Sequence, residues 1–502
     1  MRKLLMFVIM MMVTLSAWAQ AVSPSASADT TGVTAKSIRP LPLSEAIMRA
    51  RTNSVEAAVA LDKLRTSYWE HRSYRAELLP EVMFKATAPA YFKQYSPYMD
   101  ASGNYTFVPN NYLQLNGELS IKQNIWLTGG QVSLSTSLDF MRQLDGDIYN
   151  RFMSIPVALT LNQPIFGVNN VKWSRRIEPV RFEEAKASFL TETEEVAMLA
   201  INYYFNLLMS RENRQIALQN LDNARKLYDV AVEKRKMGRI SQNDLLQMEL
   251  NLLQARSALT DNESQLRSDM FRLSTFLDLG EGEEPVPEIP AELPVAEIGY
   301  ADALAKALEN NSHAKNLRRR QLEADYAVAK AKGELRSINL FAQIGYTGTS
   351  QQFAPAYQSL RANQIAQVGF EIPILDWGKR RGKVKVAESN RRVTESSLRQ
   401  ENQEFNQNLF ILVERYNNQR RQLEISRRAD EIASKRYDTN VETFIIGKIS
   451  TLDLNDSRTA KDEARREYVN QLYLFWYYYY QIRSVTLWDY ATGTPLTNNL
   501  EF

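Results

Sequence analysis

The chain has 502 residues, no cysteine and a formal net charge of +3. Because disulfides and cysteine-linked lipid anchors are excluded, we expect stability to come from packing or oligomerisation. The near-neutral charge gives no electrostatic reason to expect a nucleic acid partner. No later segment contains the roughly 18 uninterrupted apolar residues of a spanning helix, and the mean hydropathy of -0.39 agrees. A bundle of membrane-spanning helices is therefore not expected.

The N-terminus has the pattern of a secretory signal peptide. Two cations, Arg2 and Lys3, precede an apolar run over residues 4–18, and alanine stands at both positions 17 and 19. This is the charged start, short core and small-residue cleavage site of such signals. A retained anchor is the competing interpretation, but the run is shorter than the roughly 20 residues that span a bilayer. We therefore predict a signal peptide over residues 1–19, and its removal lowers the charge from +3 to +1.

Long segments with helical periodicity and few glycines or prolines follow. We predict helices over residues 43–78, 176–237, 242–278, 301–335, 384–446 and 451–484. In the fifth of these, apolar residues recur at spacings of seven, four and three, which is typical of coiled coils. A helix of about 60 residues is on the order of 90 Å long. The helices are therefore much longer than a compact domain needs, and one face of each is polar.

The segments between the helices alternate with a period of two, which predicts strands with one apolar and one polar face. These strands cover residues 82–88, 113–126, 131–140, 157–161, 340–344 and 366–374. An antiparallel sheet on a soluble core has this pattern. A transmembrane barrel has it too, together with aromatic residues at the membrane interfaces. Seven aromatic residues between Tyr91 and Tyr112 favour the barrel.

The sequence contains an internal repeat. Residues 228–245 and 437–454 are identical at nine of 18 positions, 209 residues apart, and a second offset of 257 aligns Phe84 with Phe341. The offsets differ by 48, so the first half carries 48 extra residues between Phe84 and Pro164. We divide the chain into the signal peptide, a first repeat (20–279), a proline- and glutamate-rich linker (280–299), a second repeat (300–490) and a polar tail (491–502).

Four short motifs carry a resemblance to a known family. The helix turns read Gly-Arg-Ile-Ser at 238–241 and Gly-Lys-Ile-Ser at 447–450. Strand segments end in Gln-Pro-Ile-Phe at 163–166 and in Ile-Pro-Ile-Leu-Asp-Trp-Gly at 372–378. Together with the signal peptide, these motifs resemble the TolC family of outer membrane efflux proteins over nearly the whole mature chain.

The resemblance implies a fold that is mainly α with membrane β, assembled as a homotrimer. It implies a β-barrel in the outer membrane, a long antiparallel α-helical coiled-coil barrel across the periplasm, and a tip that docks on a periplasmic adaptor protein. Two strands per repeat would give a barrel of twelve strands. Hydrocarbon does not tolerate the open sheet edges of one chain, so we expect oligomerisation to be required.

The function implied by the resemblance is that of an outer membrane exit duct in a tripartite efflux system, which passively exports small molecules. Its partners would be the adaptor, an inner-membrane transporter and outer membrane lipid, and no enzyme activity or cofactor is expected. A duct for type I protein secretion is the alternative within the same family. A secreted structural coiled-coil protein without a pore is the alternative from another class.

By resemblance, the two helix turns lie at the periplasmic tip. Glycine permits the left-handed conformation that ends a helix, and serine caps the next helix. This structural explanation accounts for the glycines and serines but not for the matching isoleucines, which we expect to be exposed on tight turns. The predicted adaptor-docking positions are Gly238, Ile240, Ser241, Gly447, Ile449 and Ser450.

Asp453 and Asp456 are three residues apart and face one side of the last helix. By resemblance they line the periplasmic aperture, where threefold symmetry would repeat each carboxylate into a ring that prefers cations. Such crowding is expected to raise carboxyl pKa values. An ordinary solvated face is the structural alternative. Only the second repeat carries both carboxylates, since Gln247 stands where Asp456 does, so we place the gate there.

Asp244 matches a family position that helps to hold the tip closed by bonding to a neighbouring helix. The sequence departs from the family pattern nearby, because Ile449 replaces an arginine and Phe444 replaces a tyrosine that would donate a hydrogen bond. We therefore expect another contact to hold the closed state, with Arg239 and Lys448 as candidates.

The 48-residue insertion contains two alternating strands, at 113–126 and 131–140, joined by a short glycine turn. The hairpin either projects on the extracellular side, or re-enters the membrane with its short turn on the periplasmic side. The second arrangement would give six strands per chain and eighteen per trimer. We favour the projecting hairpin, because a wider barrel would mismatch a tunnel of twelve helices.

No catalytic constellation is found in the sequence. The two histidines, His71 and His313, are far apart and do not form a metal or acid–base pair by spacing. Lys379, Arg380 and Arg381 begin a basic cluster that continues through residue 385. We interpret this cluster as a solvated strand-to-helix junction, with contact to lipid phosphates or acidic cargo as alternatives.

Overall fold

The computed structural model describes residues 37–99, 102–145, 148–280, 283–290, 297–335, 337–371, 375–446 and 448–496. The predicted signal peptide, Gly447 and the end of the polar tail lie outside these ranges. Among the described helices, none is both long enough and apolar enough to cross a membrane.

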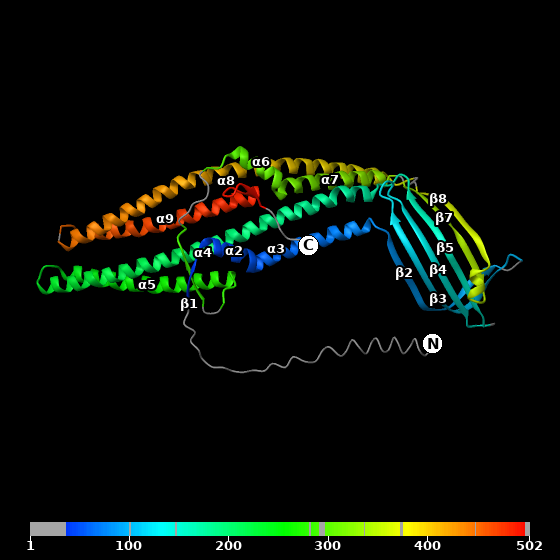
Figure 1. The fold of residues 1–502 in the computed structure, drawn as a ribbon, viewed down its shortest axis with the longest axis horizontal. Coiled ribbons are helices and arrows are strands. Elements are labelled where there is room, and N and C mark those ends of the chain that lie inside the picture. The colour runs from blue at the N-terminus through cyan, green and yellow to red at the C-terminus, as the bar shows by residue number, and fades with distance from the viewer. Residues whose placement is uncertain are drawn as a thin grey trace, which may run out of the picture.

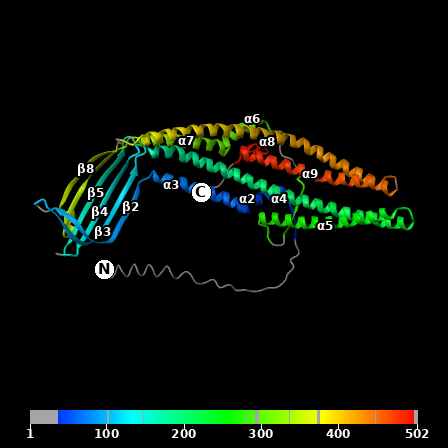
Figure 2. The same cartoon turned by 180° about the vertical axis from the view of Figure 1, so that it is seen from behind.

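The molecule consists of a long helical part and a sheet joined end to end (Figure 1). Two helical hairpins point away from the sheet, and Figure 2 shows the same arrangement from behind. The helices are α2 (Leu43–Asn53), α3 (Val55–Glu77), α4 (Asn170–Lys236), α5 (Gln242–Phe276), α6 (Tyr300–Asn310), α7 (Ser312–Gly333), α8 (Lys379–Ile445) and α9 (Thr451–Thr486). A 3-10 turn, η1 (Ala354–Tyr357), lies between the last two strands of the sheet.

Two of the predicted helices are each broken once. Ser54 ends α2 and caps α3 by accepting a hydrogen bond from the N–H of Ala57 (3.1 Å). Asn311 does the same between α6 and α7 through the N–H of His313 (2.7 Å). Both residues have extended backbone, which ends one helix and lets a side-chain oxygen start the next. The two breaks lie 257 residues apart, the first of the two sequence offsets.

The long helices α4 and α8 have 67 residues each, which corresponds to about 100 Å. The bounds of α8 lie 209 residues after those of α4, and the bounds of α6 lie 257 residues after those of α2. The second half of the chain thus begins and ends these helices at the offsets read from the sequence. Each half contributes one long hairpin and one broken helix.

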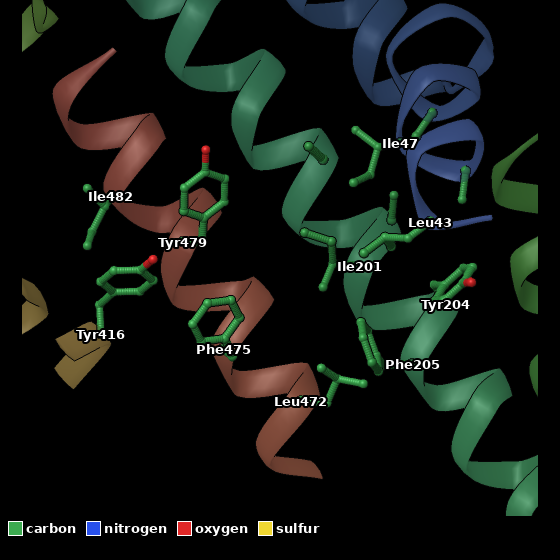
Figure 3. Packing of buried hydrophobic residues seen from close by; sticks show 14 of the residues in the cluster. Leu43, Ile47, Ile201, Tyr204, Phe205, Tyr416, Leu472, Phe475, Tyr479 and Ile482 are labelled. Atoms are coloured by element: carbon green, nitrogen blue, oxygen red, sulfur yellow. The ribbon is translucent and has the colours of Figure 1, made fainter. Parts of the chain in front are cut away.

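The core lies where α2, α4, α6, α8 and α9 meet (Figure 3). Its largest buried side chains include Tyr204 of α4, Tyr416 of α8, and Phe475 and Tyr479 of α9. Each buried aromatic side chain contributes roughly 1.5–3 kcal/mol relative to an exposed one. Without disulfides, this aromatic packing holds the middle of the long helices together.

A buried ion-pair cluster lies beside this core. The carboxylate of Glu194 in α4 contacts the guanidinium groups of Arg51 and Arg483, and the Glu194 Oε2 to Arg483 Nε distance is 3.2 Å. Arg483 also pairs with Asp489 at 3.1 Å. The cluster joins α2, α4 and α9. Although burial opposes it, the neighbouring carboxylates raise the pKa of Arg483, so the guanidinium stays charged.

The sheet has six antiparallel strands in the order β2-β3-β4-β5-β7-β8. Their bounds are β2 (Glu81–Met99), β3 (Tyr105–Asn124), β4 (Gln131–Gln143), β5 (Asn150–Pro164), β7 (Ser337–Ser350) and β8 (Leu360–Glu371). The inserted residues form β3 and β4, which pair with β2 and β5. The preference for a projecting hairpin, and the expectation of four strands per chain, were therefore wrong. The turn between β3 and β4 lies at the end of the sheet that adjoins the helices, which is where the alternative, a hairpin that re-enters the membrane, placed it.

One face of the sheet is apolar and exposed. Val82, Ile121, Leu134, Leu159 and Ile344 are direct cross-strand neighbours on five successive strands. Each of these side chains is between 41% and 65% exposed. Cross-strand neighbours share one face of a sheet, so the five form a continuous apolar row that none of the described residues covers.

The opposite face of the sheet is polar. The adjacent row across the same strands consists of Glu81, Lys122, Ser133, Thr160 and Gln343. A hydrogen bond of 2.6 Å joins two further polar side chains, Asn116 and Asp139, across β3 and β4. The inserted hairpin therefore continues both the apolar and the polar face of its neighbours.

Part of the predicted linker is a strand. Residues Glu283–Pro287 form β6, which pairs in parallel with β1 (Ser37–Leu41). The hydroxyl of Tyr204 lies 2.9 Å from the carbonyl oxygen of Leu41 and accepts the N–H of Glu288 at 2.8 Å. Prolines disfavour strands, which explains why the sequence pattern did not indicate this pairing.

Candidate functional site

The two hairpin turns lie side by side at the end of the molecule farthest from the sheet (Figure 1). Gly238 has a φ of +70° with open space around it, the left-handed conformation that ends a helix. Ile240 and Ile449 are half-buried rather than exposed, so that expectation was wrong. The carbonyl of Ile240 accepts a hydrogen bond from Arg235 (3.1 Å).

Each turn is followed by a capping box. The hydroxyl of Ser241 donates to Asp244 Oδ2 (2.7 Å) and accepts from the Asp244 N–H (3.1 Å). Ser450 and Asp453 make the same pair of bonds at 2.6 and 3.2 Å. The N–H groups of Ser241 and Ser450 also donate to these carboxylates, at 3.0 and 3.2 Å, so each box satisfies two free N–H groups at the start of its helix. Asp244 therefore caps its own helix, and no bond to a neighbouring helix is seen for it among the described contacts.

The capping bonds also set the charge of both carboxyls. The serine hydroxyl and N–H groups lower the pKa of Asp244 and of Asp453 below the usual carboxyl value. A crowded ring of carboxylates would raise the carboxyl pKa, so the lowered pKa within one chain is opposite to that expectation. Asp456 forms an ion pair with Arg436 of α8 at 2.7 Å, and both side chains are exposed. Its carboxylate is thus partly neutralised by its own hairpin.

The two hairpins contact each other through polar and aromatic side chains. Asn223 of α4 donates to the hydroxyl of Tyr437 in α8 at 2.7 Å. Nearer the tip, the ammonium group of Lys234 lies 5.7 Å from the ring centre of Phe444. These contacts join the hairpins within the described part of the chain, and the candidate role of Arg239 and Lys448 in the closed state stays a prediction.

Sequence reasoning missed the exposed apolar residues of the tip. Met237, Ile446 and Leu452 are 58%, 65% and 77% exposed. Met237 and Ile446 occupy matching positions, 209 residues apart, just before the two turn glycines. The 209-residue offset aligns these two positions, but a search for identical residues does not find them, because one is methionine and the other is isoleucine. The apolar tip surface of the described residues thus begins one residue earlier than predicted.

The outermost helices of the bundle carry exposed apolar seams. The four long helices lie in the order α5, α4, α9, α8 (Figure 1), and α4 packs against α9. On α5 the seam consists of Leu246, Leu250 and Leu253, each about half exposed. On α8 it includes Ile425 and Ile432, seven residues apart and also exposed. Spacings of three, four and seven are those of coiled-coil contacts.

The turn of the inserted hairpin rests on the start of α4. The side chain of Asn169 caps α4 by accepting from the Lys172 N–H (2.9 Å). The same side chain donates to the carbonyl oxygens of Trp126 (2.9 Å) and Leu127 (3.1 Å). The guanidinium of Arg175 lies over the Trp126 ring at 4.4 Å. These contacts connect two extra strands to the helical part without an extra helix.

The two histidines pack against aromatic rings. His71 stacks on Phe182 with ring centres 4.6 Å apart, and His313 stacks on Phe405 at 4.3 Å. Burial lowers the pKa of both imidazoles. In the described ranges, no group of three or more histidine, aspartate or glutamate side chains is placed to hold a metal ion.

A family model described as outer membrane efflux protein matches residues 110–277 and 303–475, more than half of the chain. Comparison with curated proteins finds no match. The matched ranges contain five of the six sheet strands in whole or in part, and most of both hairpins.

Several solved structures share the fold. The Campylobacter jejuni CmeC outer membrane channel is 15% identical with a TM-score of 0.63, over 91% of this chain and 87% of that chain. The Vibrio cholerae outer membrane protein VceC is 13% identical with a TM-score of 0.61, over 91% and 97%. The open state of the Neisseria gonorrhoeae MtrE outer membrane channel is 13% identical with a TM-score of 0.57, over 90% and 89%.

Proposed function

This chain belongs to the outer membrane efflux protein family, and we propose that three copies of it form the exit duct of a tripartite efflux system. Members of this family are channel proteins of the outer membrane, not enzymes. The observation that carries the proposal is the sheet, which has an uncovered apolar face, a polar face and two unpaired edges. The helical hairpins would then extend from the membrane into the periplasm.

The two faces of the sheet suit a wall between lipid and water. The exposed apolar row from Val82 to Ile344 fits hydrocarbon, and the polar row from Glu81 to Gln343 fits an aqueous lumen. In a soluble protein such a large exposed apolar face would be an aggregation hazard. Transmembrane barrels place apolar and polar residues on opposite faces in this way.

The edge strands support closure by other copies. Among the described strands, β2 and β8 end the sheet, and each offers one unpaired edge. Unpaired backbone groups are not stable in hydrocarbon, so β8 of one copy would pair with β2 of the next. Three copies with six strands each would form a barrel of eighteen strands. Barrels of 16 to 18 strands leave a water-filled channel.

The helical seams support the same assembly. In a ring of three copies, the seam of α5 would face the seam of α8 in the next copy, as α4 faces α9 within one copy. Replacing Leu250 with Asp should therefore reduce trimers in native mass spectrometry. Gln247→Asp places the same charge at an already polar position of the same helix and should leave trimers intact. Equal trimer yields from the two variants would count against this contact.

Adaptor docking at the tip is supported by exposed apolar side chains on both turns. We keep Gly238, Ile240, Ser241, Gly447, Ile449 and Ser450 as docking positions and add three exposed residues: Met237, Ile446 and Leu452. Ile446→Asp should leave trimers intact and reduce crosslinking to the adaptor. Ile449→Asp should have a smaller effect, because this side chain is half-buried. Undiminished crosslinking in both variants would contradict docking at the tip.

We place the aperture at Asp453 and Asp456, with Asp244 capping the neighbouring helix. In a trimer each carboxylate would be repeated three times at the narrow end, which would favour cations. The variant with both residues replaced by Asn should weaken cation preference in single-channel recordings. An unchanged reversal potential would contradict the placement of Asp453 and Asp456 at the aperture.

Channel activity itself is tested by reconstitution into planar bilayers. An exit duct gives discrete conductance steps, whereas a structural coiled-coil protein gives none. A duct for type I protein secretion also conducts, so identification of the inner-membrane protein that copurifies with the adaptor distinguishes it from an efflux duct.

A further inference from the structure

Positive charge gathers where the helices meet the sheet. Four ten-residue stretches adjoin the sheet, at the end of α3, the start of α4, the end of α7 and the start of α8 (Figure 2). Residues 69–78, 169–178, 326–335 and 376–385 contain twelve lysines and arginines but five aspartates and glutamates. This end of the helical part therefore carries a net charge of +7, although the whole chain carries only +3.

The helix dipole favours the cations in the last turns of α3 and α7, but it does not account for those at the starts of α4 and α8. Both α4 and α8 lack an acidic residue in the first turn. Lys172, Arg175 and Arg176 occupy the first two turns of α4, and five cations occupy the first two turns of α8. Cations near the start of a helix are repelled by its dipole. Their placement thus opposes folding, which calls for another role.

Many of these cations are free to meet a ligand. Lys332 and Lys385 share the carboxylate of Glu388. In contrast, Lys172, Arg175, Arg176, Lys379 and Arg381 are exposed and form no ion pair with a carboxylate of the described residues. We call these five residues the junction belt.

Tryptophans lie near the belt: Trp126, Trp173 and Trp377 adjoin it, and Trp69 lies about two helical turns farther from the sheet, where α3 packs on Phe182 of α4. Four of the seven tryptophans of the chain are found here: Trp69, Trp126, Trp173 and Trp377. Arginine guanidinium groups lie over three of the rings, at 4.9 Å for Trp69, 4.4 Å for Trp126 and 5.5 Å for Trp173. Trp377 is 90% exposed, directly before the cations of α8. Tryptophan beside arginine and lysine, at the border of an apolar face, is typical of a membrane–water interface.

We propose that the junction belt binds the phosphate groups of anionic phospholipids in the membrane leaflet nearer the helices. This inference rests on the proposed function, because it requires the apolar face of the sheet to lie in the membrane. Arginine pairs with phosphate through two parallel hydrogen bonds, and lysine adds a point charge. The belt would prefer phosphatidylglycerol to phosphatidylethanolamine, whose net charge is zero.

The arrangement favours a lipid over a soluble phosphate or an acidic cargo. The belt cations come from the starts of two different helices, α4 and α8, which both adjoin the sheet that carries the apolar face. A lipid headgroup at the border of that face also has its acyl chains beside the apolar rows of the sheet. The exposed tryptophans match the apolar part of such a ligand, which neither free phosphate nor a polar anion possesses.

The test uses the full mature chain, purified as a trimer in neutral detergent and mixed with equal amounts of phosphatidylglycerol and phosphatidylethanolamine. Native mass spectrometry counts the lipids of each kind that stay bound. The variant Arg175→Gln, Arg176→Gln, Lys379→Gln, Arg381→Gln removes four belt cations. Each cation near an anionic surface contributes about a fivefold preference, so the loss of four cations should reduce the preference for phosphatidylglycerol by about 600-fold.

The matched control replaces Arg427 and Arg428 with Gln. These two arginines are exposed on the same helix α8, far from the sheet, and pair with Glu431. The control should keep the wild-type lipid preference. Millimolar inorganic phosphate, added as a competitor, should displace little phosphatidylglycerol, whereas displacement would identify a soluble anion as the ligand and overturn the proposal.

Two further results would overturn it. The first is an unchanged lipid preference in the belt variant. The second is a shift of the reversal potential in the belt variant while its lipid preference stays the same, and this result would assign the belt to the lumen. Trimer formation and conductance are measured on the same samples. A wild-type chain that forms no channel counts against the proposed function, whereas a conducting trimer without lipid preference counts against the belt alone.

Discussion

Asn169 connects the inserted hairpin to the helical part through one side chain, and Asn169→Asp separates its two roles. The wild-type oxygen caps α4 through Lys172 N–H, while the amide nitrogen donates to Trp126 and Leu127 carbonyls. Aspartate keeps the cap, because it is as good an N-cap as asparagine. It removes both donors and brings a negative carboxylate toward two carbonyl oxygens.

The expected magnitude follows from the two lost hydrogen bonds. Each neutral hydrogen bond contributes about 0.5–1.5 kcal/mol, so the turn at 125–130 should lose about 1–3 kcal/mol of opening free energy. About 1.4 kcal/mol corresponds to a factor of ten in an equilibrium constant. Amide exchange at Gly129 and Ile125, whose N–H groups close this turn, should therefore be roughly 5 to 150 times faster.

Hydrogen–deuterium exchange measured by mass spectrometry on the protein in lipid nanodiscs checks this prediction. In Asn169→Asp only the turn should exchange faster, and the first turn of α4 should stay protected. In Asn169→Ala both should exchange faster, because the cap is lost as well. Wild-type exchange of the turn in Asn169→Asp would refute the reasoning, since it would mean that these two hydrogen bonds do not hold the hairpin on α4.

Three further predictions concern buried and exposed charges. Glu194→Gln leaves Arg483 buried without its main partner, which costs about 3–5 kcal/mol and should lower the melting temperature of the protein. Glu192→Gln on the same helix, where the partner is an exposed lysine, should cost about 0–1 kcal/mol. Equal melting temperatures would contradict this. Because the pKa of Asp453 is lowered by folding, its cap is present above the unfolded carboxyl pKa and is lost as the pH falls through the folded pKa. Exchange at the start of α9 should therefore rise only below about pH 4, and a rise near neutral pH would contradict the cap. Arg436→Gln frees the Asp456 carboxylate and should increase cation selectivity in single-channel recordings, and decreased selectivity would contradict its partner role.

The long helices and most strands were predictable from the sequence because their periodicity runs over many residues. The predicted range 384–446 differs from α8 by five residues at its start and one at its end. The breaks at Ser54 and Asn311 were not predicted, because neither a glycine nor a proline marks them. A capping side chain with extended backbone is enough to end a helix, and such residues also occur inside loops.

For the inserted hairpin, the barrel of twelve strands implied by the family resemblance was preferred to what the residue pattern itself indicated. Its strict alternation, at 113–126 and 131–140, already predicted two strands with the same two faces as their neighbours. The projecting arrangement was preferred because a wider sheet lacks matching helices. The side chain of Asn169 resolves this mismatch by holding the free turn on α4, a contact over more than 40 residues that no local pattern reveals.

The candidate site was predictable in position but not in detail. The repeated Gly-x-Ile-Ser turns located the tip, yet the exposure of Met237 and Ile446 depends on how each turn folds back. The partner of Asp456 is Arg436, across the hairpin, and its identification requires the register between α8 and α9. Sequence spacing alone indicated a shared helix face for the two carboxylates, not the contacts that lower or offset their charge.

The most direct test of the account is a cryo-electron microscopy map of the mature protein in lipid nanodiscs, in which the strands of the membrane part are counted. The account predicts three copies around a closed barrel of eighteen strands, with β8 of each copy beside β2 of the next and the β3–β4 turn on the helical side. A barrel of twelve strands with β3 and β4 outside the wall, or a single chain with open sheet edges, would contradict it.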